Sequence, residues 1–273
     1  MARQTRNLRT ALRVRPGSRV DLAKVDPAAT HGHTKPRSEA ELAAGVERLT
    51  DLQDRIWAEG RRKILVVLQG IDAAGKDGTV RHVMSAFNPQ GCSVTPFKAP
   101  SADELAHDYL WRIHRQMPGK GEIVVFNRSH YEDVLVVRVH DLVPKEVWSR
   151  RYDQINAFER LLVEEGTTIL KFFLYIDRDE QRARLQARLD DPSKRWKFRL
   201  GDLEERKRWN DYIAAFEDVL ERCSTDQAPW YLIPSNRKWF RNLAVADILA
   251  DTLDDLKPRY PKPEENLEGV VVE

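Results

Sequence analysis

The sequence predicts an α/β fold in which a parallel β-sheet is flanked by helices on both faces. Apolar segments of strand length alternate with helical segments from residue 63 to about residue 256, which is typical of a parallel sheet. The first strand segment, 63–69, is apolar at every position from 64 to 68, as expected for a strand buried on both faces. Because the chain has 273 residues and 41% of them are hydrophobic, it can bury one large core of this kind.

The predicted elements follow one another in a regular order. The predicted strands are 63–69, 93–97, 122–126, 168–176 and 230–233. The predicted helices are one that starts at a capping-box pattern from Ser38 to Glu41, then 78–87, one that starts at a second capping box from Ser101 to Glu104, 145–165, and one that ends near residue 256. Glycines at 60 and 166 are expected to end the first and the fourth of these helices.

Three segments lie outside this alternation. Residues 1–36 carry Arg3, Arg6, Arg9, Arg13, Arg15 and Arg19. We expect them to form an N-terminal arm that packs across the domain 37–260, although a solvated arm, a transit peptide or an arm near a polyanion fits the same composition. The charged helical segment 178–223 resembles an insertion rather than core, with a lid at about 190–210. The Pro- and Glu-rich tail 261–273 is expected to be flexible.

Composition excludes several classes of protein. Lysine and arginine number 45 against 43 aspartates and glutamates, and this balance argues against a purely electrostatic nucleic-acid binder. Two cysteines, Cys92 and Cys223, exclude a disulfide scaffold and a multi-thiolate metal centre. The longest aliphatic run, 64–68, is too short to cross a bilayer, and no signal peptide is recognised. We therefore expect a cytoplasmic protein without a nucleic-acid or membrane partner.

A phosphate-binding loop is predicted at 70–76, where the residues GIDAAGK have the form G-x-x-x-x-G-K. The loop directly follows a strand and precedes a helix, so backbone N–H groups and the helix N-terminus can bind phosphate while Lys76 supplies a mobile cation. A glycine-rich connector with a solvated lysine explains this context less well. The residues expected to contact nucleotide phosphates here are Gly70, Ala73, Ala74, Gly75, Lys76, Asp77, Gly78 and Thr79.

Two aspartates distinguish this loop from the usual P-loop. Asp77 stands where a Ser or Thr hydroxyl ordinarily holds Mg²⁺, and Asp72 lies inside the loop. A carboxylate repels phosphate unless a cation lies between them. We therefore expect Asp72 to bind Mg²⁺ or to activate an acceptor, with a turn-forming aspartate as the alternative.

A second polar cluster follows strand 122–126. Arg128 is expected at the carboxyl end of the sheet, where a guanidinium suits phosphate oxygens. Asn127 offers a neutral oxygen where P-loop proteins normally present an aspartate, and Glu132 and Asp133 can restore the missing negative charge. His130 is interpreted as a structural histidine.

Basic residues farther along the chain are candidates for binding linked phosphates. The segment 194–199 is rich in cations and aromatics next to a predicted phosphate loop, which favours a lid that closes over phosphates. The helix after it, with alternating charges, is more simply a salt-bridged solvated face. Each remaining cation, taken singly, fits an ordinary surface residue as well. The candidates are Lys98, Arg112, Arg138, Lys194, Arg195, Lys197, Arg199 and Arg208.

The three segments 70–79, 126–133 (FNRSHYED) and 194–197 (KRWK) together resemble the motifs of the type 2 polyphosphate kinases, in the order found in that family and within residues 37–260. The resemblance implies a thymidylate-kinase-like P-loop kinase fold with a helical lid. It also implies Mg²⁺ as cofactor, with Mn²⁺ as an alternative, and assembly into a homodimer or homotetramer. The resemblance places Asp72, Lys76 and Arg128 at the transferred phosphoryl group.

The implied activity is reversible phosphoryl transfer from inorganic polyphosphate to AMP and ADP, and to the related guanine nucleotides. Many members of the family have aspartate where this chain has Asn127, and the asparagine version looks like the subgroup that acts on both mono- and diphosphates. We expect Asp133 to join Asp72 in holding the metal. The acceptor phosphate is expected in the loop 70–76, and polyphosphate is expected to enter from the lid side along Arg128.

Two other functions are compatible with a P-loop. An ATP-dependent nucleotide or nucleoside kinase would need one adenosine-sized donor site instead of an open basic channel. A non-catalytic polyanion-binding module is disfavoured by the acidic residues within the phosphate loop, and a GTPase by the lack of an Asn-Lys-x-Asp segment.

Overall fold

A computed structural model describes residues 7–85, 87–263, 265–266, 268 and 270–272. Five parallel strands form one sheet in the order β2-β3-β1-β4-β5. The strands are β1 (Lys63–Gln69), β2 (Cys92–Pro96), β3 (Ile123–Asn127), β4 (Thr167–Tyr175) and β5 (Trp230–Pro234). The predicted α/β class with a parallel sheet is therefore confirmed, with each strand within a residue or two of its expected bounds.

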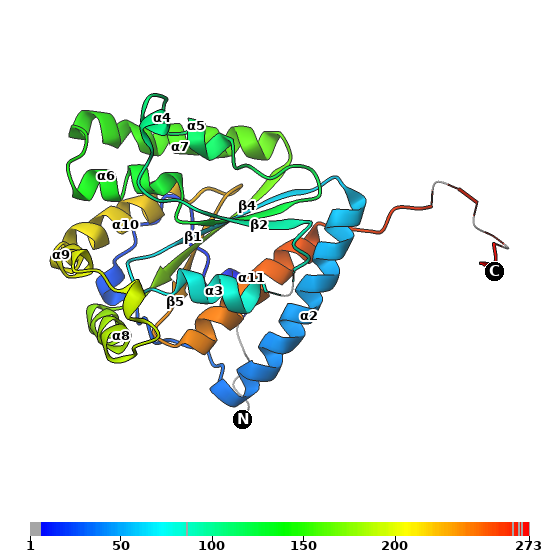
Figure 1. The fold of residues 1–273 in the computed structure, drawn as a ribbon, viewed down its shortest axis with the longest axis horizontal. Coiled ribbons are helices and arrows are strands. Elements are labelled where there is room, and N and C mark those ends of the chain that lie inside the picture. The colour runs from blue at the N-terminus through cyan, green and yellow to red at the C-terminus, as the bar shows by residue number, and fades with distance from the viewer. Residues whose placement is uncertain (1–6, 86, 264, 267, 269, 273) are drawn as a thin grey trace.

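Helices cover both faces of the sheet (Figure 1). On one side lie α2 (Lys35–Glu59), α3 (Lys76–Val83) and α11 (Lys238–Asp255). The opposite side carries α7 (Lys145–Glu164) and α10 (Trp209–Cys223). The shorter helices are α1 (Leu8–Ala11), α4 (Ala102–Leu105), α5 (Trp111–His114), α6 (Val136–Val139), α8 (Arg178–Asp190) and α9 (Gly201–Lys207), with single turns of 3₁₀ helix at Leu22–Lys24, His130–Asp133 and Arg195–Lys197.

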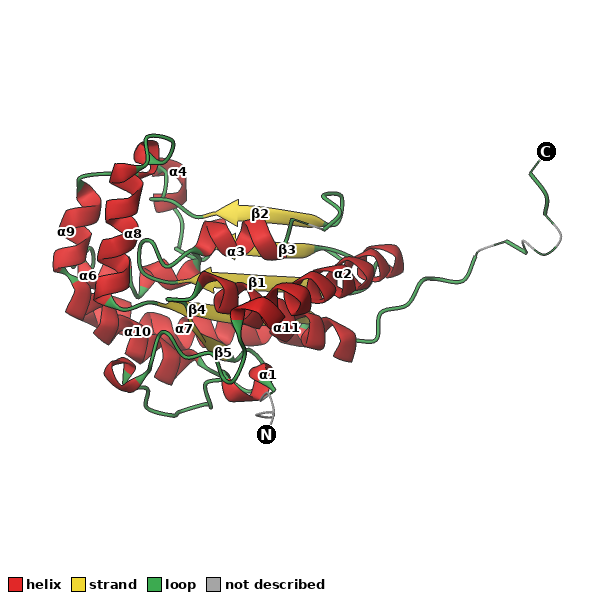
Figure 2. Cartoon of the chain, turned by 90° about the horizontal axis from the view of Figure 1, so that it is seen from below, coloured by secondary structure: helices red, strands yellow, loops and turns green. Residues whose placement is uncertain are grey.

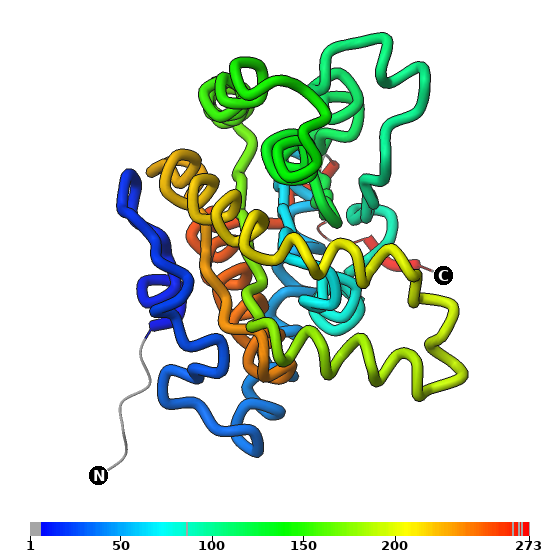
Figure 3. Tube along the Cα trace, turned by 90° about the vertical axis from the view of Figure 1, so that its left-hand side faces the viewer, coloured from blue at the N-terminus to red at the C-terminus, as the bar shows by residue number. Residues whose placement is uncertain are grey.

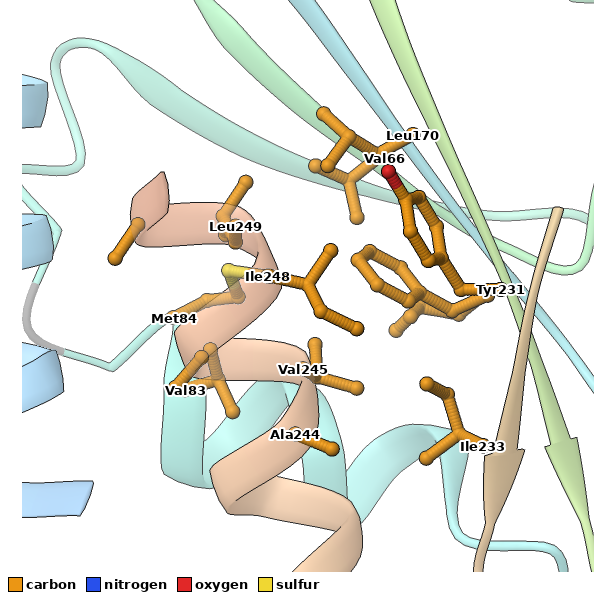
Figure 4. Close-up of a cluster of buried hydrophobic side chains, with 14 of the residues drawn as sticks. Val66, Val83, Met84, Leu170, Tyr231, Ile233, Ala244, Val245, Ile248 and Leu249 are labelled. Atoms are coloured by element: carbon orange, nitrogen blue, oxygen red, sulfur yellow. The ribbon is translucent and has the colours of Figure 1, made fainter. Parts of the chain in front are cut away.

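Strand β1 shows why the sheet is buried on both faces. Successive side chains of a strand point to opposite faces, so Ile64 and Val66 pack into the core under α2 and α11, while Leu65 and Val67 pack into the core under α7 and α10. Figure 4 shows part of the first core, where α11 brings Val245, Ile248 and Leu249 against strand residues. A strand buried on both faces can have no polar alternation, which is the pattern seen in the sequence.

The parallel strands all point toward one end of the molecule, where α6, α8 and α9 stand (Figure 2). Figure 3 views this end and shows the chain from α8 to α10, coloured yellow-green to gold, lying across it. The loops that follow β1 and β3 open on the same end, because β1 and β3 are hydrogen-bonded neighbours. This arrangement places the two polar motifs of the sequence side by side.

Two helix starts differ from the prediction. Helix α2 begins at Lys35, after Thr34, and Ser38 is a buried residue within it instead of its N-cap. Pro36 in the first turn favours this earlier start because its fixed φ suits a helix N-terminus and its missing N–H is not needed there. Helix α3 is shorter than predicted, and it starts at Lys76 within the phosphate loop. The second capping box is confirmed, since Ser101 and Glu104 exchange both hydrogen bonds.

The segment 178–223 is only partly an insertion, and its interpretation as peripheral was wrong for α10. Phe216 of α10 stacks on Phe173 of β4, with ring centroids 4.2 Å apart, and Leu220 is fully buried. Helix α10 is amphipathic, and its apolar face was concealed in the sequence by the charged stretch that precedes it.

The N-terminal arm packs against the domain as expected. Val14 donates its N–H to the carbonyl of Trp230 at 2.8 Å, and Leu232 donates to the carbonyl of Leu12 at 2.9 Å, so the arm lies along β5 and forms an isolated antiparallel bridge between Arg13 and Tyr231. Leu8 and Leu22 are buried. Arg3 and Arg6 lie outside the described residues, as do positions 264, 267, 269 and 273 of the tail, whose other residues form neither helix nor strand. Within the part of the chain that is described, no helix combines the length and the apolar character needed to cross a membrane.

Candidate active site

The loop between β1 and α3 has the geometry of a phosphate cradle. Gly75 caps α3 with a left-handed φ of 110°, and Ala73 is also left-handed at 67°, so the backbone curls around the helix N-terminus. A Cβ on Gly75 would overlap the guanidinium of Arg241, and a Cβ on Gly70 would lie 2.8 Å from the carbonyl oxygen of Leu174. Both glycines are therefore required by close packing around the loop as well as by its curvature.

Lys76 is folded back into its own loop. Its Nζ donates to the carbonyl oxygen of Gly70 at 2.6 Å, and its side chain is buried. Burial, with the nearby Arg128 as the second cause, lowers the pKa of Lys76 to about 8. The ammonium is thus held beside the cradle, where an incoming phosphate would favour its charged form.

Arg128 joins the loop after β3 to the phosphate loop. Its backbone is left-handed, with a φ of 66°, and its guanidinium donates to Asp72 at 2.7 Å and to Glu132 at 3.4 Å. Asn127 donates its side-chain N–H to Asp77 at 2.8 Å. The structure therefore brings together the catalytic residues predicted from the two motifs.

A buried polar network supports the loop after β3, and sequence reasoning missed two of its members. Glu159 of α7 accepts hydrogen bonds from Tyr131 at 2.8 Å and from Lys171 of β4 at 2.6 Å, and a third neighbour, His130, lies 3.2 Å away. Burial alone would raise the pKa of Glu159, but Lys171 and His130 hold it below its ordinary value. His130 is fully buried, as expected of a structural histidine.

A basic cavity of about 880 Å³ opens beside the phosphate loop. Its walls come from the phosphate loop, the ends of β2 and β3, helix α8, the segment 194–202 and the start of α11. Ten lysines and arginines line it against four carboxylates, so it attracts a polyanion. The lining cations are Lys76, Lys98, Arg128, Arg184, Arg188, Lys194, Lys197, Arg199, Lys238 and Arg241.

Three arginines in this wall, Arg184, Arg188 and Arg241, were not predicted, and two of them contact the phosphate loop. Arg184 donates to the carbonyl oxygens of Ala73 and Ala74 at 3.0 and 2.9 Å and thereby braces the phosphate loop. Arg241 is 3% exposed and lies against Gly75 and Gly78. The signal in the sequence was a cation within the apolar face of the last helix, next to Phe240, which is unusual unless the cation has a partner or a ligand.

A second cavity, of about 760 Å³, lies on the other side of Arg128. Its walls are largely apolar and come from α4, α6, the start of α7 and the loops around them; they include Leu105, Tyr109, Val137, Val143 and Val147. The charged groups in this wall include three ion pairs, Arg112–Glu104, Arg128–Glu132 and Arg151–Asp133. Arg151 donates to Asp133 at 2.8 Å and lies over the ring of Tyr109. An apolar pocket with a few placed polar groups is the usual form of a small-molecule site.

The predicted polyphosphate-binding residues fall into three groups. Lys98, Lys194, Lys197 and Arg199 line the basic cavity. Arg112 is nearly buried, donates to the carbonyl of Lys98 at 2.9 Å and lines the apolar cavity instead. The others lie away from both cavities with protein partners: Arg138 with Asp218, Arg195 with the carbonyl of Leu189, and Arg208 with the carbonyl of Val139. Residue type alone did not reveal these internal partners, and a polyphosphate-binding role for these three arginines stays a prediction that neither cavity supports.

The predicted joint metal site of Asp72 and Asp133 is not assembled in this structure. Asp72 lines the basic cavity, whereas Asp133 lines the apolar cavity and pairs with Arg151. Burial raises the pKa of Asp133 to about 6, although Arg151 opposes this. Mg²⁺ is commonly held by one or two carboxylates together with substrate phosphates and water. Asp72 and Asp77, at the mouth of the phosphate loop, fit that mode, and no described cluster of three such ligands is arranged to hold a metal by itself.

A parallel sheet in this strand order, with a phosphate loop after its central strand and cations from the next strand facing it, defines a P-loop kinase-like protein. The sequence matches the profile of the family described as Polyphosphate kinase 2 over residues 32–261. The chain belongs to this family.

Named relatives agree with this assignment. The chain is 54% identical over 264 residues to the AMP/ADP-polyphosphate phosphotransferase of Meiothermus ruber, with 96% of this chain and 98% of the relative covered. It is 46% identical over 266 residues to the ADP-polyphosphate phosphotransferase of Rhodopseudomonas palustris, with 92% and 91% covered. The crystal structure of Polyphosphate Kinase 2 from Arthrobacter aurescens TC1 superposes with a TM-score of 0.93 at 46% identity and covers 96% of this chain and 94% of that chain.

Proposed function

We propose that this protein transfers phosphoryl groups from inorganic polyphosphate to AMP and ADP. The observation that carries the proposal is the pairing of two unlike cavities that share Phe97, Lys98 and Arg128. One is basic and surrounds a phosphate loop, and the other is apolar and large enough for a nucleoside. A polyanionic donor and a nucleotide acceptor fit these two cavities and meet at Arg128.

This placement reverses the expectation that the acceptor phosphate occupies the loop 70–76. The cations face the basic cavity, so the donor chain fits the phosphate loop, with its terminal phosphate near Lys76 and Arg128. The nucleoside fits the apolar cavity, from which its phosphate can reach Arg128. A terminal phosphate oxygen of the acceptor attacks the terminal phosphorus of the chain. The P–O bond to the chain breaks, and the shortened chain leaves as an oxyanion.

Lys76 and Arg128 supply positive charge where the phosphoryl group moves, and the phosphate-loop amides bind its equatorial oxygens. Arg128 is also bound to Asp72 and Glu132, which fixes its direction before substrate arrives. Mg²⁺, held by Asp72 and Asp77 together with phosphate oxygens, would neutralise charge shared by donor and acceptor. Guanine acceptors, a homodimer or homotetramer and a cytoplasmic location stay predictions.

A matrix of donors and acceptors tests the proposal. Long-chain polyphosphate or ATP is supplied as donor, with AMP, ADP, GMP or GDP as acceptor, and products are separated by chromatography. We expect ADP and ATP from AMP and ADP with polyphosphate, and chain growth when ATP is supplied in excess. Transfer from ATP to AMP or to a nucleoside, without transfer from polyphosphate, would instead identify an ATP-dependent kinase and overturn the proposal.

A further inference from the structure

The basic cavity extends well past the phosphate loop. At one end it shares Lys98 and Arg128 with the apolar cavity. Its wall also includes α8 and the start of α11, which contribute Arg184, Lys238 and Arg241 and do not line the apolar cavity. None of these three residues belongs to the motifs found in the sequence, and the transfer step described above does not use Lys238 or Arg241.

The cations at this far end lack full compensation. Arg241 donates to the side-chain oxygen of Asn242 at 2.8 Å and approaches the carbonyl oxygen of Ala74 at 3.4 Å. Among the described residues no carboxylate is in ion-pair contact with Arg241 or Lys238, although Arg241 is 3% exposed. Burial, with Arg184 as the second cause, lowers the pKa of Arg241 to about 10 and also lowers that of Lys238. Buried cations that repel one another are stabilised when an anion binds between them.

Two glycines of the phosphate loop and α3 leave the space that the guanidinium of Arg241 occupies. Cβ atoms on Gly75 and Gly78 would collide with, or lie 2.9 Å from, the guanidinium nitrogens of Arg241. The phosphate loop is therefore packed directly on a buried guanidinium. Lys238, the first residue of α11, is exposed and lines the basic cavity beside Arg241. Its ammonium can therefore contact a bound anion directly, whereas the buried Arg241 acts on the anion through its charge.

The direction of the donor chain follows from the two cavities. If the acceptor enters from the apolar cavity, the reacting end of the donor lies near Arg128, and the rest of the chain must run away from that cavity. The remaining length of the basic cavity leads along α8 to the start of α11. Each further phosphate of the chain carries negative charge that needs a cation there.

We propose that Lys238, backed by the buried Arg241 and Arg184, forms a distal subsite for phosphate groups of the donor that lie beyond the phosphate loop. The subsite makes the enzyme prefer long donor chains over short ones, because only phosphate groups beyond those held at the phosphate loop contact Lys238. This proposal rests on the proposed function, since it assigns the donor to the basic cavity.

The test compares Lys238→Met with the matched control Lys145→Met. Lys145 is also the exposed first residue of a long helix, α7, but it lines neither cavity. For each protein, kcat/KM is measured for long-chain polyphosphate and for tripolyphosphate at saturating ADP. We expect Lys238→Met to lower the ratio of long-chain to tripolyphosphate kcat/KM by about tenfold, the value of one charge-assisted hydrogen bond. KM for ADP should stay within about twofold, and Lys145→Met should leave the ratio as in the wild type.

The possible results separate the two proposals. Wild-type protein that does not use polyphosphate contradicts the proposed function. Wild-type protein that uses both donors with equal kcat/KM contradicts the distal subsite alone. An equal loss with both donors, no loss with either, or the same change in Lys145→Met also overturns the subsite.

Discussion

The basic and the apolar cavity lie on either side of Arg128 and differ in the chemistry of their walls. The basic cavity concentrates cations from six parts of the chain around the phosphate loop, and it contains buried charge that is incompletely compensated without a ligand. In the wall of the apolar cavity, Arg112, Arg128 and Arg151 are each paired with a carboxylate (Glu104, Glu132 and Asp133), and most of the remaining surface is hydrocarbon. The difference indicates that the donor is selected by charge and the acceptor by shape and burial.

The two cavities also differ in how they affect titratable groups. In the basic cavity, burial and neighbouring cations lower the pKa values of Lys76 and Arg241. In the apolar cavity, burial raises the pKa of Asp133 even though Arg151 is its partner. Substitutions in the basic cavity should therefore alter use of the donor, and substitutions in the apolar cavity should alter binding of the acceptor. The following predictions test this separation.

The largest effect is expected from Lys76→Met. This change removes the cation at the transferred phosphoryl group, and preorganised charge partners of this kind contribute about 3–4 kcal/mol to the transition state, or about 10²–10³-fold in kcat. Steady-state kinetics with polyphosphate and ADP measures the loss, and circular dichroism checks the fold. A folded variant with a rate near that of the wild type would remove Lys76 from the mechanism.

Asp133→Asn tests whether burial dominates the apolar cavity. The native pKa of Asp133 is raised to about 6, above its unfolded value, so the native state binds the extra proton and stability falls as pH rises through this range. The full shift corresponds to roughly 3 kcal/mol. Wild type should therefore lose stability relative to Asp133→Asn between about pH 4 and pH 7. Urea unfolding of both proteins at about pH 4 and about pH 7 measures their free energies of unfolding. If the difference between wild type and variant does not change with pH, or changes in the opposite direction, the prediction is contradicted.

Filling the apolar cavity should weaken acceptor binding alone. Ala99 lies in an exposed loop that lines this cavity, and Ala99→Trp would occupy part of it. We expect KM for ADP and AMP to rise about tenfold, which corresponds to ~1.4 kcal/mol of binding free energy. KM for polyphosphate should change less than twofold. Ala106→Trp is the matched control, since Ala106 is exposed and lines neither cavity. If Ala99→Trp raised KM for polyphosphate instead, the apolar cavity would be the donor site, and the assignment of the acceptor to it would be wrong.

The smallest effect is expected from Ser101→Ala. Ser101 caps α4, whose residues Glu104 and Leu105 line the apolar cavity. Loss of such a cap costs ~1 kcal/mol of local stability. KM for ADP should rise about two- to threefold while KM for polyphosphate is unchanged. Equal changes in both constants would show that α4 does not serve the acceptor cavity alone.

The basic cavity was partly predictable because its cations occur in local runs or beside motifs. Residues 70–79 and 194–199 are contiguous, and neighbouring parallel strands bring Arg128 to the same edge as the phosphate loop. Arg241 and Lys238 were missed because the basic segment 237–241 belongs to no recognised motif and lies more than a hundred residues along the chain from the loop that it faces. The apolar cavity could not be predicted at all, since valines and leucines on α4, α6 and α7 carry no sign of whether they face a core or a cavity.

Local sequence determined the strands, most of the helices, the phosphate loop and the chemistry of its cations, because each depends on residues that are neighbours along the chain. Tertiary structure decided which isolated charges meet. It paired Asp133 with Arg151, turned Arg138 toward Asp218 and buried Arg241 beneath Gly75. Those outcomes depend on the packing of helices onto the sheet, which sets the distance between side chains far apart in sequence and therefore the strength of their electrostatic interaction.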